Sequence, residues 1–404
     1  MISNILSLNK KNEKNRNNSM IPKKFTFYKT ISFDIFNRNY YNNRACIFTY
    51  SNDNNIYIVY GSKTLDLEYY DIIKEKKYIV IKKIHQMPFE SCREFYDKIN
   101  NRNLILTSSF DEHVKVVNFK KEKSEIIIDL NLESNIITII NTACLINNKI
   151  VVPFSNVESG IIDLYNMNST KIGKIEECGF ILGLSGYYWK KIKKYFILVA
   201  NLKGIIAYNE DNLSIYKKFI PKFQDEKEFN GFHQGYIVEN NGLLKLFCPC
   251  FYYGYLFSFD FVNGCLINKI SFDSGISDIC IWDNKYIFVS LNKCNDYHFA
   301  LINSKSGKIE KKFVEIEKDS KICGIKVIRS ESKGDYLITF NMSGKLNLYI
   351  IKKPKILINL LFMLIFIICL IPVFSNFQFV KKILYSLLLI FSLLFIKKYL
   401  WINR

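Results

Sequence analysis

The sequence lacks the short motifs by which many enzymes are recognised. It contains no HExxH zinc motif and no GxSxG nucleophile motif, and it has only four histidines among 404 residues. The pair Lys63-Thr64 resembles the end of a phosphate-binding loop, but Ser62 and Tyr57 stand where that loop requires glycine. The acidic residues form no obvious pair of neighbouring carboxylates. We therefore expect a protein that is not an enzyme and that binds no cofactor.

The first 24 residues also lack the apolar run of about 7 to 15 residues that a secretory signal requires. We therefore expect the main part of the chain to remain in the cytosol, with its cysteines as reduced thiols. Residues 1–24 carry six lysines and arginines against a single acidic residue, Glu13. This composition predicts a disordered basic arm.

Close cysteine pairs are rare as well. Cys248-Pro249-Cys250 is the single close pair, and His233 precedes it by 15 residues. A zinc site normally uses two such pairs or a Cys/His motif. A site here is conceivable, but two reduced thiols at the end of a strand account for the pair more simply. We expect no bound metal.

Long apolar runs are confined to the C-terminal 53 residues. Residues 356–374 form a run of 19 residues without a charge, which as a helix is roughly 28 Å long and close to the thickness of a bilayer core. A second run, 383–396, has 14 residues and either completes a helical hairpin or lies in the membrane interface. We therefore predict that residues 353–404 anchor the chain in a membrane.

Lysines flank this tail asymmetrically. The charged residues next to the two runs are Lys352, Lys353 and Lys355 before the first, Lys381 and Lys382 between them, and Lys397, Lys398 and Arg404 after the second. Because positive charge concentrates on the cytosolic side of membranes, this pattern favours a hairpin with both ends in the cytosol. The chain would then be an integral membrane protein.

The rest of the chain lacks a long amphipathic helix and instead repeats a strand pattern. A short strand, a polar or Gly-containing turn and a second strand recur, and the second strand ends in an apolar residue that is usually followed by Asp or Asn. The end pairs are Tyr70-Asp71, Val117-Asn118, Tyr165-Asn166, Tyr208-Asn209, Phe259-Asp260, Ile302-Asn303 and Tyr349-Ile350, spaced 43 to 51 residues apart. Blades of four strands repeat at about 40–45 residues. The pattern predicts an all-β, seven-bladed propeller over residues 25–352, with Phe25–Phe36 available as the outer strand of the last blade.

The second of these units resembles the WD-repeat family. His85 is similar to the histidine before the inner strand, and Ser109 and Asp111 resemble the strand serine and turn aspartate of the family's structural tetrad. Val117 stands where the tetrad has tryptophan. The resemblance implies a WD-repeat-like propeller in which these residues hold a blade together and catalyse nothing.

The family that this pattern resembles mostly binds other proteins, so the first functional hypothesis is an interaction scaffold on the cytosolic face of an endomembrane. A cytosolic propeller followed by a C-terminal anchor is also similar to the endoplasmic-reticulum exchange factor of the COPII-coat GTPase. That resemblance implies, as the alternative, a small GTPase as partner and a role in vesicle transport. Residues 37–60, however, contain no glycine, whereas that family has a Gly-rich loop in its first blade.

The net charge of +19 suggests an anionic partner. The lysines are scattered, and several lie beside the apolar tail, so we expect a membrane surface and no nucleic acid. The lysines that we expect to face anionic lipid are Lys190, Lys191, Lys193 and Lys194, together with Lys352, Lys353 and Lys355. A further cluster comprises Lys74, Lys76, Lys77, Lys82 and Lys83. An ordinary solvated surface is the alternative for all of them.

Overall fold

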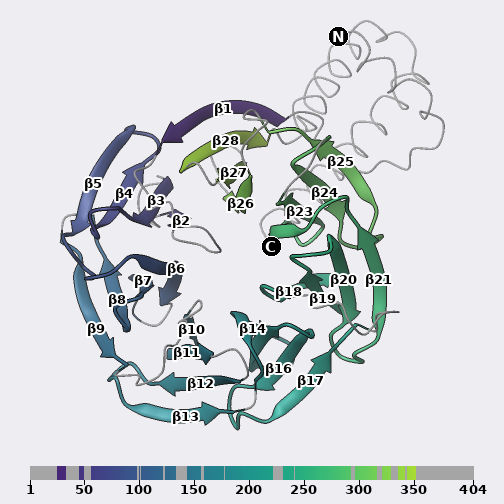
Figure 1. Ribbon diagram of the computed structural model, residues 1–404, viewed down its shortest axis with the longest axis horizontal. Helices are drawn as coiled ribbons and strands as arrows, with labels where there is room; N and C mark the ends of the chain where they lie inside the picture. The colour runs from purple at the N-terminus through teal and green to yellow at the C-terminus, as the bar shows by residue number, and fades with distance from the viewer. Residues whose placement is uncertain are drawn as a thin grey trace, which may run out of the picture. The chain divides into compact units, whose positions relative to one another are not determined.

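Seven four-stranded antiparallel sheets follow one another around a ring in the computed structural model (Figure 1). The structure describes residues 25–351 except 33–44, 50–55, 98–99, 101, 122, 133–142, 156–158, 177, 222–230, 241, 293–295, 316–320, 329–334 and 342–343. Residues 25–351 form one compact unit. The predicted all-β, seven-bladed propeller is therefore confirmed.

Each blade contributes one strand to each of four concentric positions. The first, innermost strands are β2 (Ala45–Thr49), β6 (Phe89–Asp97), β10 (Cys144–Ile146), β14 (Ile181–Trp189), β18 (Tyr236–Asn240), β22 (Ile276–Trp282) and β26 (Ile322–Ile328). The second strands are β3 (Ile56–Gly61), β7 (Arg102–Ser109), β11 (Lys149–Ser155), β15 (Lys194–Asn201), β19 (Leu243–Pro249), β23 (Tyr286–Leu291) and β27 (Asp335–Asn341). The third strands are β4 (Leu67–Asp71), β8 (His113–Phe119), β12 (Gly160–Tyr165), β16 (Ile205–Asn209), β20 (Tyr255–Asp260), β24 (Phe299–Asn303) and β28 (Lys345–Ile351). The outer strands are β5 (Lys76–Ile81), β9 (Glu125–Asn131), β13 (Lys171–Ile175), β17 (Ile215–Phe219), β21 (Leu266–Ser271), β25 (Ile309–Phe313) and β1 (Phe25–Ser32).

The repeated apolar–Asp/Asn pair marks the end of the third strand. In all seven blades the pair lies within one residue of that strand's last residue. The side chain of Asp71 accepts hydrogen bonds from the backbone N–H groups of Ile73 and Lys74, both at 2.9 Å. Short polar side chains favour turns because they bond the backbone of the residues that follow. The repeat is visible in the sequence because most third strands are followed by such a turn, as at Asn166, Asp260 and Asn303.

The core lies between the blades. A separate cluster of buried apolar residues fills each junction between neighbouring blades, seven clusters in the described residues. The second strands are buried on both faces, as in β23, whereas the residues of the outer strand β5 are all exposed or half-buried. At the junction between the fourth and fifth blades, the ring of Phe261 stacks on Phe219 with centroids 5.5 Å apart. Each blade is thus stabilised mainly by its neighbours.

The ring is closed by the beginning of the described chain. Strand β1 pairs with β28, from Phe25 opposite Ile351 to Ser32 opposite Lys345. The Thr30 hydroxyl donates to the side-chain oxygen of Asn347 at 2.6 Å. The prediction that the segment starting at Phe25 supplies the outer strand of the last blade is confirmed for residues 25–32.

The antiparallel order gives the propeller two different faces. Turns between first and second strands, and between third and outer strands, lie on one face, and the remaining turns and the linkers between blades lie on the other. Because Phe25 pairs with Ile351, both ends of the propeller lie on the first of these, which we name the exit face. The opposite face is named the linker face.

No helix occurs in the described part of the chain. Within it, no segment has the length and apolar character of a membrane-spanning helix. The predicted basic arm at 1–24 and the predicted anchor at 353–404, with its apolar runs 356–374 and 383–396, lie outside the described residues.

Candidate functional site

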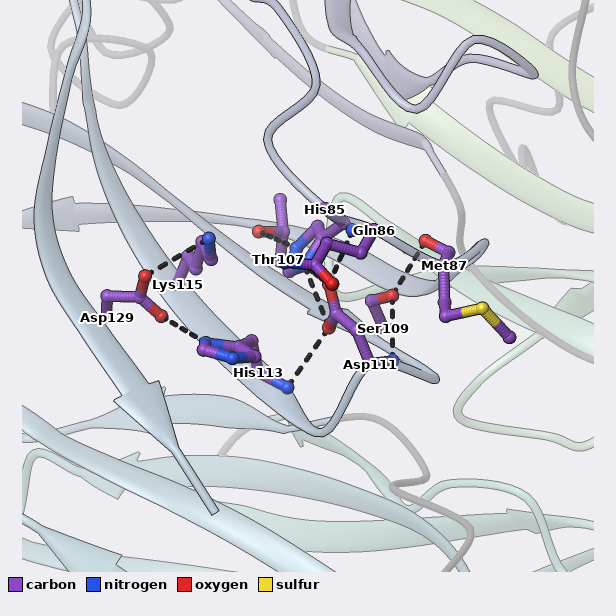
Figure 2. Close-up of polar contacts among 9 residues, drawn as sticks. All are labelled: His85, Gln86, Met87, Thr107, Ser109, Asp111, His113, Lys115 and Asp129. Atoms are coloured by element: carbon purple, nitrogen blue, oxygen red, sulfur yellow. Dashed lines mark hydrogen bonds and ion pairs between the residues drawn. The ribbon is translucent and has the colours of Figure 1, made fainter. Parts of the chain in front are cut away.

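His85 is the centre of a buried polar group in the second blade, β6–β9 (Figure 2). It lies in the linker between β5 and β6, while Thr107 belongs to β7 and Asp111 to the turn between β7 and β8. Nδ1 of His85 lies 3.0 Å from Oδ2 of Asp111, and Nε2 lies 2.9 Å from the hydroxyl of Thr107. The group therefore ties the interblade linker to the blade that follows it.

Asp111 accepts more than one hydrogen bond. The backbone N–H groups of Gln86 and His113 donate to its carboxylate at 2.8 and 3.1 Å. Burial by itself raises the pKa of Asp111, but the hydrogen bonds from His85, Gln86 and His113 outweigh it and hold the pKa well below its usual range. Because the ionised carboxylate can only accept, Nδ1 of His85 carries the hydrogen of their shared bond.

Ser109 lies beside this group but does not contact His85. Its hydroxyl donates to the carbonyl oxygen of Met87 at 2.8 Å. The strand hydroxyl that reaches the histidine is that of Thr107, two residues earlier on the same side of β7. Val117, at the place of the family's tryptophan, is buried between the first and second blades. Thr107 is thus the member of the group that the sequence alone did not reveal.

A hydroxyl, an imidazole and a carboxylate in a chain resemble a nucleophilic triad, but here they are inaccessible. Thr107 is fully buried, and His85 is 2% exposed. A nucleophile needs space beside it for the reacting atom of a substrate. The arrangement can fix the linker between blades, and it offers no place for a substrate.

Replacing Asp111 by Asn should lower the free energy of unfolding at pH 7 by about 1–3 kcal/mol, because buried donors lose their charged acceptor. The folded-state pKa of Asp111 is depressed, so its contribution is fully present above the unfolded pKa of about 4 and is lost as the pH falls towards the folded value. Denaturant unfolding between pH 7 and pH 3 should therefore show a smaller acid-induced loss in Asp111→Asn than in the parent.

The matched control is Asp129→Asn in the same blade. Asp129 pairs with His113 and Lys115 at distances of 2.6 and 3.1 Å, but its side chain is 43% exposed. A pair this exposed is worth at most about 1 kcal/mol. Equal losses of stability in the two variants would contradict the role assigned to Asp111.

The cysteine pair lies in apolar surroundings. Cys248 and Cys250 belong to the buried cluster between the fourth and fifth blades. Burial raises the pKa of the Cys248 thiol well above its usual range and lowers the pKa of His233 to about 4. A protonated thiol is a poor metal ligand. Among the residues that the structure describes, no three His, Cys, Asp or Glu side chains are grouped in a way that could hold a metal ion.

The lysine clusters of the sequence fall on different faces. Lys190, Lys191 and Lys193 form the exposed turn between β14 and β15 on the exit face, and Lys194 begins β15. Lys352, Lys353 and Lys355 lie outside the described residues. The five-lysine cluster is divided by β5. Lys74, Lys76 and Lys77 lie at its exit-face end, and Lys82 and Lys83 lie on the linker face.

Similarity to known proteins is confined to the fold. No protein-family model and no curated protein sequence matches the chain. Among solved structures, a chain of the mitotic checkpoint complex is similar with a TM-score of 0.61 at 8% identity, covering 84% of this chain and 96% of that one. BBS1N in complex with ARL6DN matches at a TM-score of 0.59 and 9% identity (81% and 97% covered), and Saccharomyces cerevisiae Sqt1 at 0.54 and 10% (80% and 100% covered). The chain therefore has a fold similar to that of WD-repeat propellers.

Proposed function

We propose that the chain is a membrane-anchored interaction scaffold, with its propeller in the cytosol and its tail in an endomembrane, the endoplasmic reticulum being the expected one. The closed ring carries the proposal. Each blade is held by its neighbours, so the turns on its faces are presented on a rigid frame whose sheets have only short edges. Two structural neighbours carry protein partners in their names, the mitotic checkpoint complex and BBS1N with ARL6DN.

The linker face supplies the kind of side chain that protein interfaces use. Phe110 at the β7–β8 turn is 50% exposed, and Tyr252 at the β19–β20 turn is 57% exposed. Met87 and Tyr253 are exposed beside them. Aromatic residues and Met are enriched in protein–protein interfaces. We propose that this face receives the partner.

The apolar run 356–374 supports the anchor, since 19 uncharged residues suffice to cross a bilayer. The exchange-factor alternative has less support. Neither the fold nor the comparisons favour it, and residues 37–60 contain no glycine. We therefore propose the scaffold, and capture of its neighbours in cells identifies the partner.

Proximity labelling in intact cells tests the proposal. A biotin-labelling enzyme is fused to the N-terminus of the full chain for this purpose. We expect labelled neighbours to be cytosolic and membrane-associated, and we expect the membrane-associated set to disappear when residues 353–404 are removed. Phe110→Ser with Tyr252→Ser should lose the partner proteins. Ile79→Ser with Ile215→Ser is the control, because these two equally exposed residues lie on the outer strands β5 and β17. Labelling of lumenal proteins alone, or equal losses in both variants, would contradict the proposal.

A further inference from the structure

The turns of the exit face are strongly basic in the described residues. They carry ten exposed lysines, distributed over four blades and including Lys121, Lys191 and Lys305. Against these stand three exposed carboxylates, those of Glu75, Asp211 and Asp283. This surface is therefore an extended patch of positive charge, of which Lys190, Lys191 and Lys193 are one part.

The linker face does not share this character. Its described turns and linkers carry five exposed lysines, and three exposed carboxylates accompany them, those of Glu176, Asp273 and Asp296. Two further acidic residues in the described turns of this face, Asp66 and Glu112, are partly exposed. The positive charge of the described propeller turns is thus concentrated on the face where the chain enters and leaves the ring.

Exposed aliphatic side chains stand among the exit-face lysines. Ile73 precedes Lys74 in the β4–β5 turn, and Ile192 lies between Lys191 and Lys193. Val262 is exposed in the β20–β21 turn of the fifth blade. Aliphatic residues flanked by lysines suit the boundary between lipid headgroups and acyl chains, where the ammonium groups meet phosphate and the aliphatic groups leave water.

We propose that the exit face of the propeller rests on an anionic lipid leaflet, so that the linker face points into the cytosol. The inference rests on the proposed membrane anchor, because it is the tail after Ile351 that brings this face to the bilayer. Lysines in four blades contact lipid phosphates, and Ile73, Ile192 and Val262 enter the headgroup layer. The propeller thus has a fixed orientation, which leaves Phe110 and Tyr252 available to a partner.

Lysine footprinting of the full chain tests this orientation without any substitution. The chain is reconstituted into phosphatidylcholine vesicles with or without phosphatidylserine and treated with a water-soluble acylating reagent. We expect phosphatidylserine to reduce acylation of Lys190, Lys285 and Lys308 by about fivefold, and high salt to restore it. Lys82, Lys203 and Lys321 on the linker face are also exposed, so they serve as internal controls and should not change.

A pair of charge-reversal variants adds a second readout. Lys190→Glu with Lys191→Glu should remove most of the phosphatidylserine-dependent protection of Lys285 and Lys308 in the sixth blade, since both blades must approach the leaflet together. Lys82→Glu with Lys203→Glu introduces the same charge on the linker face and should leave that protection intact. Unchanged protection in the first variant would overturn the proposal.

The remaining outcomes separate the inference from the anchor. Retention of the chain after alkaline carbonate washing, with equal acylation on both vesicle types, would overturn the orientation and leave the anchor standing. Release from both vesicle types would overturn the anchor, and the footprint on phosphatidylserine vesicles would still decide which face binds lipid. Protection by soluble polyglutamate but not by phosphatidylserine would assign the exit face to an acidic protein and overturn the proposal.

Discussion

Deleting residues 1–32 should abolish cooperative unfolding of the propeller, whereas deleting residues 1–24 should leave it unchanged. The longer deletion removes β1, and with it the backbone hydrogen bonds along β28 and the contact of Thr30 with Asn347. The last blade then lacks its outer strand, and the backbone groups of β28 that paired with β1 become an open sheet edge. The loss should exceed about 5 kcal/mol, which is comparable to the whole stability of an ordinary domain.

Denaturant unfolding of both truncated chains in detergent, followed by circular dichroism, measures this effect. The two deletions differ by eight residues, so the shorter one controls for loss of the basic arm. Loss of β1 also affects a buried polar contact. Asn347, which accepts from Thr30 of β1, donates to Glu315 in the linker between the sixth and seventh blades at 2.7 Å. A two-state transition of similar midpoint in both chains would show that the ring is stable without its outer closing strand.

Phe261→Ala should destabilise the propeller by about 3–5 kcal/mol, the usual cost of emptying a large buried aromatic site. Phe261 is fully buried and follows the turn residue Asp260 at the end of β20. Its ring meets those of Phe219 and Phe196 of the fourth blade, with centroids 5.5 and 5.4 Å away. Phe261 is therefore one of the fifth-blade side chains that fill the junction with the fourth blade.

Chemical denaturation of Phe261→Ala beside Val262→Ala measures this contribution. Val262 is the next residue and is exposed, so its truncation should change stability by less than about 0.5 kcal/mol. If both variants lose the same amount, the turn rather than the aromatic junction is the source of the stability.

The blade count and the closing strand could be predicted from the sequence because local chemistry marks them. Asp71 and Asp260 follow apolar residues at strand ends because each caps the backbone of the following turn, and that requirement recurs in most blades. Aromatic and β-branched residues dominate Phe25–Ser32 and favour a strand there. This strand precedes the first complete blade and has no partner there. The last blade of the ring has a vacant outer position, which the strand fills.

The identity of the hydroxyl beside His85 could not be predicted in the same way. Thr107 and Ser109 are two residues apart in β7, so both side chains point to the same side of the sheet. Which of them meets the imidazole depends on the height at which the linker carrying His85 crosses the blade. That height is set by packing between blades, which leaves no local pattern in the sequence.

The division of the lysines between faces is a further consequence of strand geometry. Lys74 and Lys83 are close in sequence, but the six residues of β5 span about 20 Å between them. The strand carries the chain from the exit face to the linker face. A cluster along the sequence is therefore no cluster on the surface, and Lys74 is grouped instead with lysines of other blades.

Contacts across the ring were also beyond sequence reasoning. The innermost strand of the third blade, β10, has only three residues. Arg93 of the second blade donates from its guanidinium to the carbonyl oxygen of Leu184 in the fourth blade at 2.8 Å. These residues are 91 positions apart in the sequence, and they come from blades that are not neighbours in the ring.

The pairing of β1 with β28 also determines the stage of synthesis at which the propeller can complete its folding. β1 is the first strand of the propeller to be translated, and it can pair only after β28, the last strand, has been made. A further 53 residues follow Ile351. Until β28 has been made, β1 lacks its partner strand, and its unpaired backbone groups are a template for pairing with another chain. Closure joins positions more than 300 residues apart, and pairings of such long range form slowly. Ring closure and synthesis of the apolar tail therefore fall close together in time, and a chaperone that holds β1 until then would raise the yield of folded protein.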